Sequence, residues 1–261
     1  MNEVNKTLYI PLYGKAFVSG KNIILKDKKA EEIWGEVQFP LKSKSKSKFL
    51  AYYMGMRAKV FDNYVCSEAD KKSLIIHLGC GLDSRNERTA LKNKWYDVDF
   101  PEVIAERKIY FTENESYKMI SSDIRDKKWL EEIDENKSAV ILMEGISMYL
   151  KEDELRELFA NISDHFENVK IFMDAYSGFA AKASKYKNPV NEVGVSEVFG
   201  IDEPKVLEND KIKFIKEWEI TPDYLINELK GFEKAIFKKL YGGSISKKLY
   251  KLYEFKQEDK A

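Results

Sequence analysis

Cysteine is scarce in this sequence of 261 residues, which contains only Cys66 and Cys80. Two cysteines do not make a disulfide framework, so a reducing compartment is expected and we predict a cytoplasmic protein. No cluster of metal-ligating residues accompanies Cys80, so no metal site is predicted. The scarcity of cysteine therefore argues against the class of small, disulfide-stabilised secreted domains.

A surplus of one charge is also lacking, since 44 Lys and Arg residues balance 44 Asp and Glu residues. Neutrality argues against general nucleic-acid binding and against attachment to anionic membranes. No apolar run approaches the roughly 18 residues of a membrane span, and the N-terminus lacks the apolar core of a signal peptide. We therefore predict no nucleic-acid partner and no membrane partner, and leave the oligomeric state open.

The stretch Ser73–Gly81 is the one around which the rest of the chain can be arranged. The apolar run over 74–78 predicts a strand that is buried on both faces of a parallel sheet. Gly79 and Gly81 follow directly, and glycine permits both a sharp turn and a close approach of the backbone to a ligand. A dinucleotide-binding fingerprint would have a third glycine where this chain has Ser84. The motif is thus weak by itself and is also compatible with a plain strand-to-helix turn.

Strands and helices are predicted to alternate along most of the chain. This alternation implies an α/β fold with a doubly wound, mostly parallel sheet. The predicted strands cover residues 74–78, 95–99, 118–121, 139–143, 169–173, 212–220 and 249–255. The predicted helices cover 7–17 with a break near Pro11, 30–34, 49–64, a segment from about Asp83, 101–111, 129–133, 151–166 and 222–229.

A single domain is expected for the whole chain, 1–261. Residues 1–48 would form an N-terminal helical extension, 49–174 the cofactor-binding core, and 201–261 the completion of the sheet. Residues 175–200 interrupt the rhythm of strands and helices with small residues and glycines. This composition predicts an irregular inserted segment that covers the sheet as a lid.

Acidic residues follow three successive predicted strands. Asp97 and Asp99 end the second strand, 18 and 20 residues after Gly79, a spacing at which an acid can accept hydrogen bonds from both hydroxyls of a ribose. Asp123 follows the third strand, and Glu144 follows the fourth. Because the carboxyl ends of parallel strands meet at one edge of a sheet, these acids predict a site for a nucleoside-bearing cofactor.

Three motifs resemble the leucine carboxyl methyltransferase family, which includes the tetracenomycin-type polyketide O-methyltransferases of bacteria. They are Leu78–Arg85 (LGCGLDSR), Trp95–Val103 (WYDVDFPEV) and Glu144–Leu150 (EGISMYL), and the opening Thr7–Tyr13 (TLYIPLY) is similar to the bacterial branch. The resemblance covers roughly residues 7–174. It implies a class I methyltransferase fold, which is Rossmann-like, and S-adenosylmethionine as the cofactor.

Motif matching assigns a set of predicted cofactor residues, each of which is implied by the resemblance. The set comprises Gly79 and Gly81 at the glycine turn beside the methionine part, Asp99 at the ribose, Asp123 and Ile124 around the adenine, Glu144 near the methionyl amino group, and Arg57 at the cofactor carboxylate. Lys15 is a looser match, and Asp97 stays open as an alternative to Asp99. His77 stands where the family usually has asparagine and Cys80 where it has alanine, and neither departure removes an expected ligand.

Several other residues invite a functional interpretation that competes with a structural one. His77 lies inside an apolar strand, where a hydrogen-bonded core histidine is more common than a catalytic one, and His165 falls late in an amphipathic helix and is expected to be solvated. Tyr176, Phe179 and Tyr186 could line an acceptor pocket, although aromatic residues near the edge of a core are usually part of that core.

The resemblance implies an O-methyltransferase that acts on a carboxylate or a hydroxyl of a small molecule. A carboxylate acceptor needs no base because it is ionised near neutral pH, whereas a hydroxyl would benefit from one. No residue stands out for that catalytic role. The alternatives are an NAD-dependent oxidoreductase on the same fold, a protein C-terminal carboxyl methyltransferase, and a cofactor-binding module without activity. The missing third glycine argues against the oxidoreductase.

Overall fold

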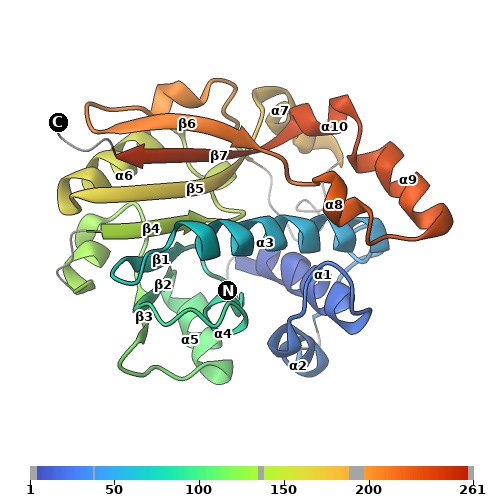
Figure 1. The fold of residues 1–261 in the computed structure, drawn as a ribbon, viewed down its shortest axis with the longest axis horizontal. Helices are drawn as coiled ribbons and strands as arrows, with labels where there is room; N and C mark the ends of the chain where they lie inside the picture. The colour runs from blue at the N-terminus through green and yellow to red at the C-terminus, as the bar shows by residue number, and fades with distance from the viewer. Residues whose placement is uncertain (1–4, 38, 135–137, 188–196, 258–261) are drawn as a thin grey trace.

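A seven-stranded sheet with the order β3-β2-β1-β4-β5-β7-β6 forms the centre of the structure (Figure 1). The structure is a computed structural model that describes residues 5–37, 39–134, 138–187 and 197–257. Strands β1 to β5 pair in parallel, while β7 runs antiparallel to its neighbours β5 and β6. The prediction of a doubly wound, mostly parallel sheet is confirmed.

The elements have the following bounds. The strands are β1 (Leu74–Leu78), β2 (Trp95–Asp99), β3 (Tyr117–Ser121), β4 (Ser138–Met143), β5 (Asn168–Tyr176), β6 (Ile212–Trp218) and β7 (Tyr250–Gln257). The α-helices are α1 (Tyr9–Gly20), α2 (Lys28–Glu36), α3 (Lys48–Glu68), α4 (Arg85–Arg88), α5 (Pro101–Tyr110), α6 (Glu152–His165), α7 (Gly178–Lys187), α8 (Asp223–Ile226), α9 (Gly231–Tyr241) and α10 (Ser244–Leu249). Short 3₁₀ turns are η1 (Asn5–Leu8), η2 (Lys127–Glu132), η3 (Ser147–Tyr149) and η5 (Pro204–Leu207).

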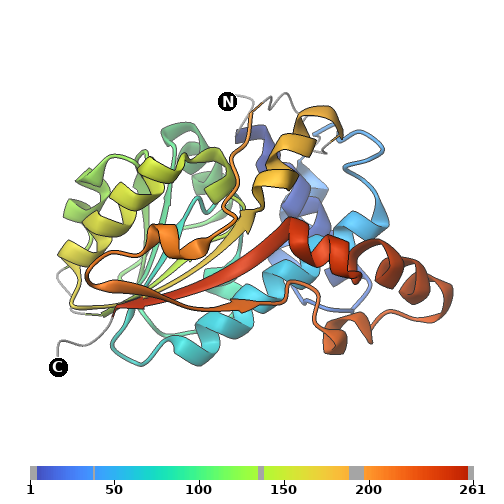
Figure 2. The ribbon, with the colours of Figure 1, turned by 90° about the horizontal axis from the view of Figure 1, so that it is seen from above.

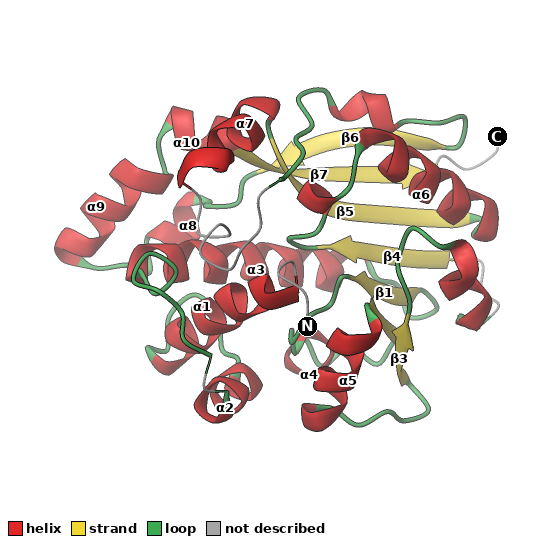
Figure 3. Cartoon of the chain, turned by 180° about the vertical axis from the view of Figure 1, so that it is seen from behind, coloured by secondary structure: helices red, strands yellow, loops and turns green. Residues whose placement is uncertain are grey.

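The two faces of the sheet are covered by different helices (Figures 1 and 3). Side chains alternate along a strand, so Ile75 packs toward the face of α3 and α5, while Leu74 and Ile76 pack toward the face of α6. Helix α3 is buried on most sides because it lies between the sheet and α1. Both faces of the central strands are thus apolar, which is why their sequences are continuous apolar runs.

A group of helices lies beyond the carboxyl ends of the parallel strands (Figure 2). The group consists of α1 and α2 from the start of the chain and α8, α9 and α10 from its end. The rings of Tyr53 in α3 and Tyr241 in α9 lie 4.9 Å apart, so α9 packs against α3. None of the described helices is long and apolar enough to cross a membrane.

Some local predictions were wrong. Helix α1 is not broken near Pro11, because proline in the first turn replaces an N–H that has no partner within the helix. The helix expected from about Asp83 is present, but it is short, since it begins at Arg85 and ends at Arg88. The segment 175–200 is not irregular throughout: β5 continues to Tyr176, α7 follows, and residues 188–196 lie outside the described part of the chain. Helices α9 and α10 were not predicted.

Candidate functional site

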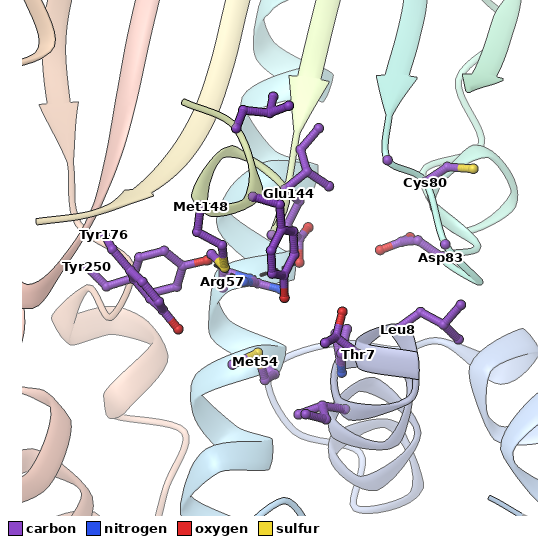
Figure 4. A pocket seen from close by; sticks show the side chains of 18 of the residues that line it. Thr7, Leu8, Met54, Arg57, Cys80, Asp83, Glu144, Met148, Tyr176 and Tyr250 are labelled. Atoms are coloured by element: carbon purple, nitrogen blue, oxygen red, sulfur yellow. Dashed lines mark hydrogen bonds and ion pairs between the residues drawn. The ribbon is translucent and has the colours of Figure 1, made fainter. Parts of the chain in front are cut away.

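A pocket of about 770 Å³ lies at the carboxyl ends of the parallel strands. This volume falls within the roughly 300–1,000 Å³ of small-molecule sites. All of the predicted cofactor residues line it: Arg57, Gly79, Gly81, Asp99, Asp123, Ile124 and Glu144. Figure 4 shows Arg57, Glu144 and Tyr250 gathered on one side of the pocket, with Cys80 and Asp83 across from them. Residues from four strand ends and from α3 therefore meet around one cavity.

The glycine turn after β1 has the backbone conformation that its sequence predicted. Gly79 and Gly81 have φ angles of +68° and +51°, in the left-handed region that side chains disfavour. A Cβ atom added to Gly79 would overlap the side chain of Ile146. The N–H of Gly79 donates to the carbonyl of Val98 at 2.8 Å, which joins the turn to β2. Glycine is thus required here by both conformation and space.

Asp99 lies at the end of β2 and contacts this turn. Its Oδ2 accepts a hydrogen bond from the N–H of Gly81 at 2.8 Å, and its Oδ1 accepts one from the N–H of Phe100 at 2.8 Å. Burial raises the pKa of Asp99 to about 6, against the effect of these two N–H donors. A carboxylate oxygen can accept two hydrogen bonds, so Asp99 retains capacity to accept donors from the pocket while its backbone contacts fix its position.

Asp97, the alternative that the sequence left open, lies outside the pocket. Its carboxylate is fully buried and accepts hydrogen bonds from Trp95 Nε1 at 2.9 Å, from the Tyr117 hydroxyl at 2.7 Å and from Arg107. Arg107 in turn donates to the carbonyl of Gly81 at 3.0 Å. Asp97 therefore supports the glycine turn from behind rather than facing a ligand.

Asp123 and Ile124 border the pocket beyond β3. The Asp123 carboxylate accepts from Arg125 Nε at 3.0 Å on both oxygens. Although burial opposes ionisation, these hydrogen bonds lower the pKa of Asp123. Arg125 also donates to Glu154 at 3.2 Å. Asp123 thus has a charged partner of its own, and Ile124 supplies an apolar surface next to it.

Glu144 and Arg57 contact each other directly. Arg57 Nε donates to Glu144 Oε1 at 3.0 Å, and Arg85 donates to the other oxygen of the same carboxylate. Although burial opposes ionisation, the two arginines lower the pKa of Glu144 to about 2. Glu144 is therefore a permanent anion at the end of β4, with a cation on either side.

These contacts belong to a larger buried network of charges, here called the charge network. Lys15, a looser match in the sequence, donates to Asp83 at 2.7 Å, and both side chains are almost fully buried. Asp83 is not among the cofactor residues that the sequence predicts. The network contains four cationic side chains and five carboxylates: Lys15, Arg57, Arg85 and Arg88 with Asp27, Asp62, Asp83, Glu144 and Asp174. It has one carboxylate more than it has cationic side chains, and its members Lys15, Arg57, Asp83 and Glu144 line the pocket.

Asp174 and Tyr250 are functional candidates that the sequence interpretation missed. The Tyr250 hydroxyl donates to Asp174 Oδ2 at 2.6 Å, and Arg57 donates to the same hydroxyl at 2.7 Å. Asp174 follows the strand predicted at 169–173 as Glu144 follows its strand, so the rule of strand ends could have found it. Tyr250 gave no local signal, because only the antiparallel pairing of β5 with β7 brings it to the site.

The remaining candidates have simple positions. His77 is buried, as expected for a core histidine. Its Nδ1 has no hydrogen-bond partner among the described residues, so the expectation that the buried ring is hydrogen-bonded was only partly correct. Burial, followed by the charge of Arg85, lowers its pKa to about 4, which keeps the ring neutral. His165 is exposed. Tyr176 and Phe179 line the pocket, and the side chain of Tyr186 lies outside the described ones. No group of metal-ligating side chains occurs in the described residues.

Comparison with known proteins gives matches in sequence and in fold. The family model for leucine carboxyl methyltransferase matches residues 3–163. The tetracenomycin polyketide synthesis O-methyltransferase TcmP of Streptomyces glaucescens is 27% identical over 168 residues, which are 63% of this chain and 62% of that protein. The S-adenosyl-L-methionine-dependent methyltransferase dpfgK of Gibberella zeae is 26% identical over 249 residues, which are 84% of this chain and 83% of that protein.

A solved structure shares the fold along most of its length. A protein of Thermobifida fusca that is assigned to the methyltransferases superposes with a TM-score of 0.57, covers 94% of both chains and is 14% identical. At this identity the likeness concerns the fold alone. The match to TcmP spans less than two thirds of that relative.

Proposed function

Because the chain belongs to the leucine carboxyl methyltransferase family, we propose that it transfers a methyl group from S-adenosylmethionine to an oxygen atom of a small molecule. Family membership identifies a methyltransferase that depends on S-adenosylmethionine, and the name of the Gibberella zeae relative states the same cofactor. The name of TcmP states transfer to oxygen in polyketide synthesis. The oxygen acceptor, either a carboxylate or a hydroxyl, is the proposed part.

The observation that supports this proposal most is the convergence of the predicted cofactor residues on one pocket. The charges beside that pocket suit the cofactor. S-adenosylmethionine has a sulfonium, an ammonium and a carboxylate and is a net cation, while the charged side chains that line the pocket in the described part of the chain are four carboxylates and three cations: Asp83, Asp99, Asp123 and Glu144 with Lys15, Arg57 and Arg125. Electrostatic complementarity of this kind favours the binding of a cation.

In the proposed arrangement, different parts of the cofactor contact the ends of different strands. Asp99 at the end of β2 would accept from the ribose hydroxyls, and Ile124 would pack against the adenine. Glu144 would accept from the ammonium group at the end of β4, and Arg57 and Lys15 would donate to the carboxylate. Since Arg57 and Glu144 bind each other in the structure, we expect these bonds to be exchanged rather than added when the cofactor binds.

S-adenosylmethionine supplies an electrophilic methyl group on a positively charged sulfur. The protein's part is to bind, to orient the acceptor oxygen in line and to exclude water. A carboxylate acceptor is ionised near neutral pH and requires no more than this. The strand ends of β5 and β7 remain for the acceptor, next to the proposed site of the ammonium group.

The acceptor region is proposed to lie between two covering segments of a single domain, residues 1–48 and 175–200. Within the described part of the chain, Thr7 and Leu8 from η1 and Phe179 and Ala180 from α7 line the pocket. Phe179 is 71% exposed although it borders the cavity, so its ring is available to an acceptor. Covering loops of this kind commonly exclude water during group transfer.

The NAD-dependent oxidoreductase has less support. The position of the third glycine has Ser84, which is fully buried and donates its hydroxyl to Asp27. A protein C-terminal carboxyl group is an alternative acceptor. It differs from a small-molecule carboxylate only in the part of the acceptor that lies outside the methyl-transfer site. The acceptor panel below therefore includes a peptide.

The proposal is tested with S-adenosylmethionine that is isotopically labelled in its methyl group. The purified protein is incubated with aromatic hydroxyl compounds, aromatic carboxylic acids and a peptide that ends in leucine, and labelled products are separated by mass spectrometry. We expect label on an oxygen of a small molecule. Label on nitrogen or carbon alone, on the peptide alone, or on no acceptor with cofactor bound would contradict the proposal.

A further inference from the structure

The charges of this chain are unevenly distributed along the sequence, although they sum to zero. Residues 42–48 contain four lysines and no acidic residue, and residues 229–249 contain six lysines and one acidic residue, Glu233. The zero net charge argued against attachment to an anionic membrane, but a net charge averages over the whole surface. A local excess of lysines attracts an anionic surface even where the rest of the protein is neutral.

The two lysine-rich segments lie side by side in the fold. Lys48, at the start of α3, donates to Glu233 of α9 at 2.7 Å, and the hydroxyl of Tyr52 donates to the other oxygen of this carboxylate at 2.6 Å. The one acidic residue of the two segments is therefore paired with a lysine. Lys42, Lys44 and Lys46, which precede α3, are all exposed. The loop before α3 and helix α9 thus form one surface with an excess of positive charge.

Helix α9 exposes apolar side chains on this surface. Phe232 is 79% exposed and Leu240 is 52% exposed, and the half-buried Ile236 lies midway between them in sequence. Because the three residues follow at intervals of four, they share one face of the helix. The neighbouring face carries Glu233 and the buried Phe237, which contact α3. The apolar face of α9 is therefore left uncovered by the described part of the chain, and it borders the lysine-rich loop.

Helix α9 also has an accessible place in the molecule. Figures 1 and 2 show it at one end of the longest axis, opposite the C-terminus, with α5 and α6 toward the other end. The helix begins at that end, and Phe232 is its second residue. A flat surface can therefore contact α9 without touching α5 or α6.

We propose that helix α9 and the loop 42–48 dock the protein on a membrane that contains anionic phospholipids. Amphipathic helices at membrane surfaces combine large apolar side chains with lysines, and each lysine near an anionic leaflet strengthens binding. Lysine is depleted in protein–protein interfaces, so the same surface suits an acidic protein less well. The docking face is defined here as Lys42, Lys44, Lys46, Lys230 and Lys239 with Phe232, Ile236 and Leu240.

Docking through this face would hold the pocket next to the membrane. Tyr241 at the end of α9 and Leu249 at the end of α10 line the pocket, as does Leu50, two residues after Lys48. The inference concerns binding to a surface and goes beyond the proposed methyl transfer, so it can fail or succeed independently of that function.

The test is co-sedimentation of the full chain with lipid vesicles. One set of vesicles is phosphatidylcholine alone, and the other is an equimolar mixture of phosphatidylcholine and phosphatidylglycerol. We expect binding to the mixed vesicles at low ionic strength, weaker binding as sodium chloride is added, and little binding to phosphatidylcholine alone.

Two variants of the docking face should weaken this binding. The triple variant Lys42→Gln, Lys44→Gln and Lys46→Gln should bind mixed vesicles about 100-fold more weakly, because each lysine contributes about five-fold. Phe232→Ser should weaken binding by about 10-fold, because it removes an apolar side chain from the boundary between headgroups and acyl chains. All four side chains are exposed, so we expect both variants to fold.

Matched controls remove the same groups from other parts of the surface. The triple variant Lys92→Gln, Lys127→Gln and Lys205→Gln removes three charges from exposed lysines outside the docking face. Ile109→Ser removes an apolar side chain of α5 that is 72% exposed. Both controls should bind mixed vesicles as the wild-type protein does. Equal losses in the controls and in the docking-face variants would overturn the proposal, because binding would then not depend on this face.

A fluorescence measurement locates the inserted side chain. Phe232→Trp should show additional quenching by phospholipids with brominated acyl chains, compared with the wild-type protein and with Ile109→Trp. Three results would overturn the proposal: no binding of the wild-type protein to mixed vesicles at low ionic strength, equal binding to both kinds of vesicle, or no additional quenching in Phe232→Trp. Binding to soluble polyglutamate without binding to vesicles would also overturn it and favour an acidic protein as the partner.

Discussion

Two triads of arginine, tyrosine and aspartate occur in different parts of the sheet, one at β5 and β7 and the other at β2 and β3. The pocket triad is Arg57, Tyr250 and Asp174, and the support triad is Arg107, Tyr117 and Asp97. In each, the arginine donates to the tyrosine hydroxyl, at 2.7 Å in the pocket triad and 2.9 Å in the support triad. The tyrosine then donates to the aspartate, at 2.6 and 2.7 Å respectively.

The surroundings of the two triads differ although their internal bonds agree. Asp97 also accepts from Trp95, and Arg107 extends to the carbonyl of Gly81, so the support triad is closed by protein groups and fixes a turn. In the pocket triad, Tyr250 lines the cavity and Arg57 extends to Glu144. The same three side chains can thus stabilise backbone in one place and face a ligand in another, and access to the pocket decides which.

Replacing the arginine of each triad should give the largest effects. Arg57→Met and Arg107→Met each leave a buried carboxylate without its cation, which should lower the free energy of unfolding by about 3–5 kcal/mol. Their ligand profiles should differ. Arg57→Met should weaken S-adenosylmethionine binding by about 10- to 150-fold and leave adenosine binding nearly unchanged, because only the former has a carboxylate.

Arg107→Met should instead weaken both ligands alike, because it acts through the glycine turn. Calorimetric titration of each folded variant with both ligands makes this comparison. Equal losses for S-adenosylmethionine and adenosine in Arg57→Met would show that Arg57 has only a structural role.

The pH dependence of stability isolates the pocket triad. The pKa of Asp174, raised to about 6, lies above the value of about 3.9 in an unfolded chain. The stabilising contribution of its protonated form is complete below about pH 4 and is lost as the pH rises through 6. The free energy of unfolding of wild type minus that of Asp174→Asn should therefore fall by up to about 3 kcal/mol between pH 4 and pH 7. Chemical denaturation at both pH values measures it, and a constant difference would refute the raised pKa.

Replacing the two aspartates of β2 should have different effects, since Asp99 is expected to bind the cofactor and Asp97 to stabilise the fold. Asp99→Ala should weaken S-adenosylhomocysteine binding by about 1.5–3 kcal/mol, because acceptors for two ribose hydroxyls are lost. Asp97→Ala should cost more unfolding free energy than Asp99→Ala, since it leaves Arg107 buried without a carboxylate. Ligand titration and denaturation of both variants test this. Unchanged affinity in a folded Asp99→Ala protein would exclude Asp99 as the ribose contact.

The smallest expected effect is a change in the backbone hydrogen exchange of two helices that line the pocket. When S-adenosylhomocysteine and an acceptor bind, backbone amides of α1 and α7 should exchange more slowly, because residues of both helices line the pocket. Amides of β3 around Tyr117 should not change. Peptide-level mass spectrometry reads both regions in one experiment, and equal exchange of α1 and α7 with and without ligands would argue against their covering role.

The central strands could be predicted because burial on both faces leaves a continuous apolar run. The bounds of β1 and β2 agree with the prediction, and those of β4 differ by one residue. Helix α9 could have been predicted, because Phe232, Ile236, Phe237, Leu240 and Tyr241 recur at helical spacing. Helix α10 has only six residues, which are too few to show a periodic pattern. The partners of α9 could not be read from the sequence; the ring of Phe237, for example, lies 6.2 Å from that of Tyr52 in α3.

The acids at the strand ends could also be located from the sequence, but not their partners. The spacing of the acids from Gly79 could not show that the Asp97 carboxylate accepts hydrogen bonds from Arg107 and Tyr117, whereas Asp99, two residues later, lines the pocket. Nor did it tell that Glu144 already binds Arg57 and Arg85. Such pairings join residues far apart in the chain, so they depend on tertiary packing and have no local signature.

The most direct test of the account is calorimetric titration of the wild-type protein with S-adenosylmethionine, S-adenosylhomocysteine and NAD. The excess of carboxylates beside the pocket and the contacts proposed for Asp99, Glu144 and Arg57 predict saturable binding of the first two at one site per chain and no binding of NAD. Binding of NAD without binding of S-adenosylmethionine would contradict the account and favour the oxidoreductase.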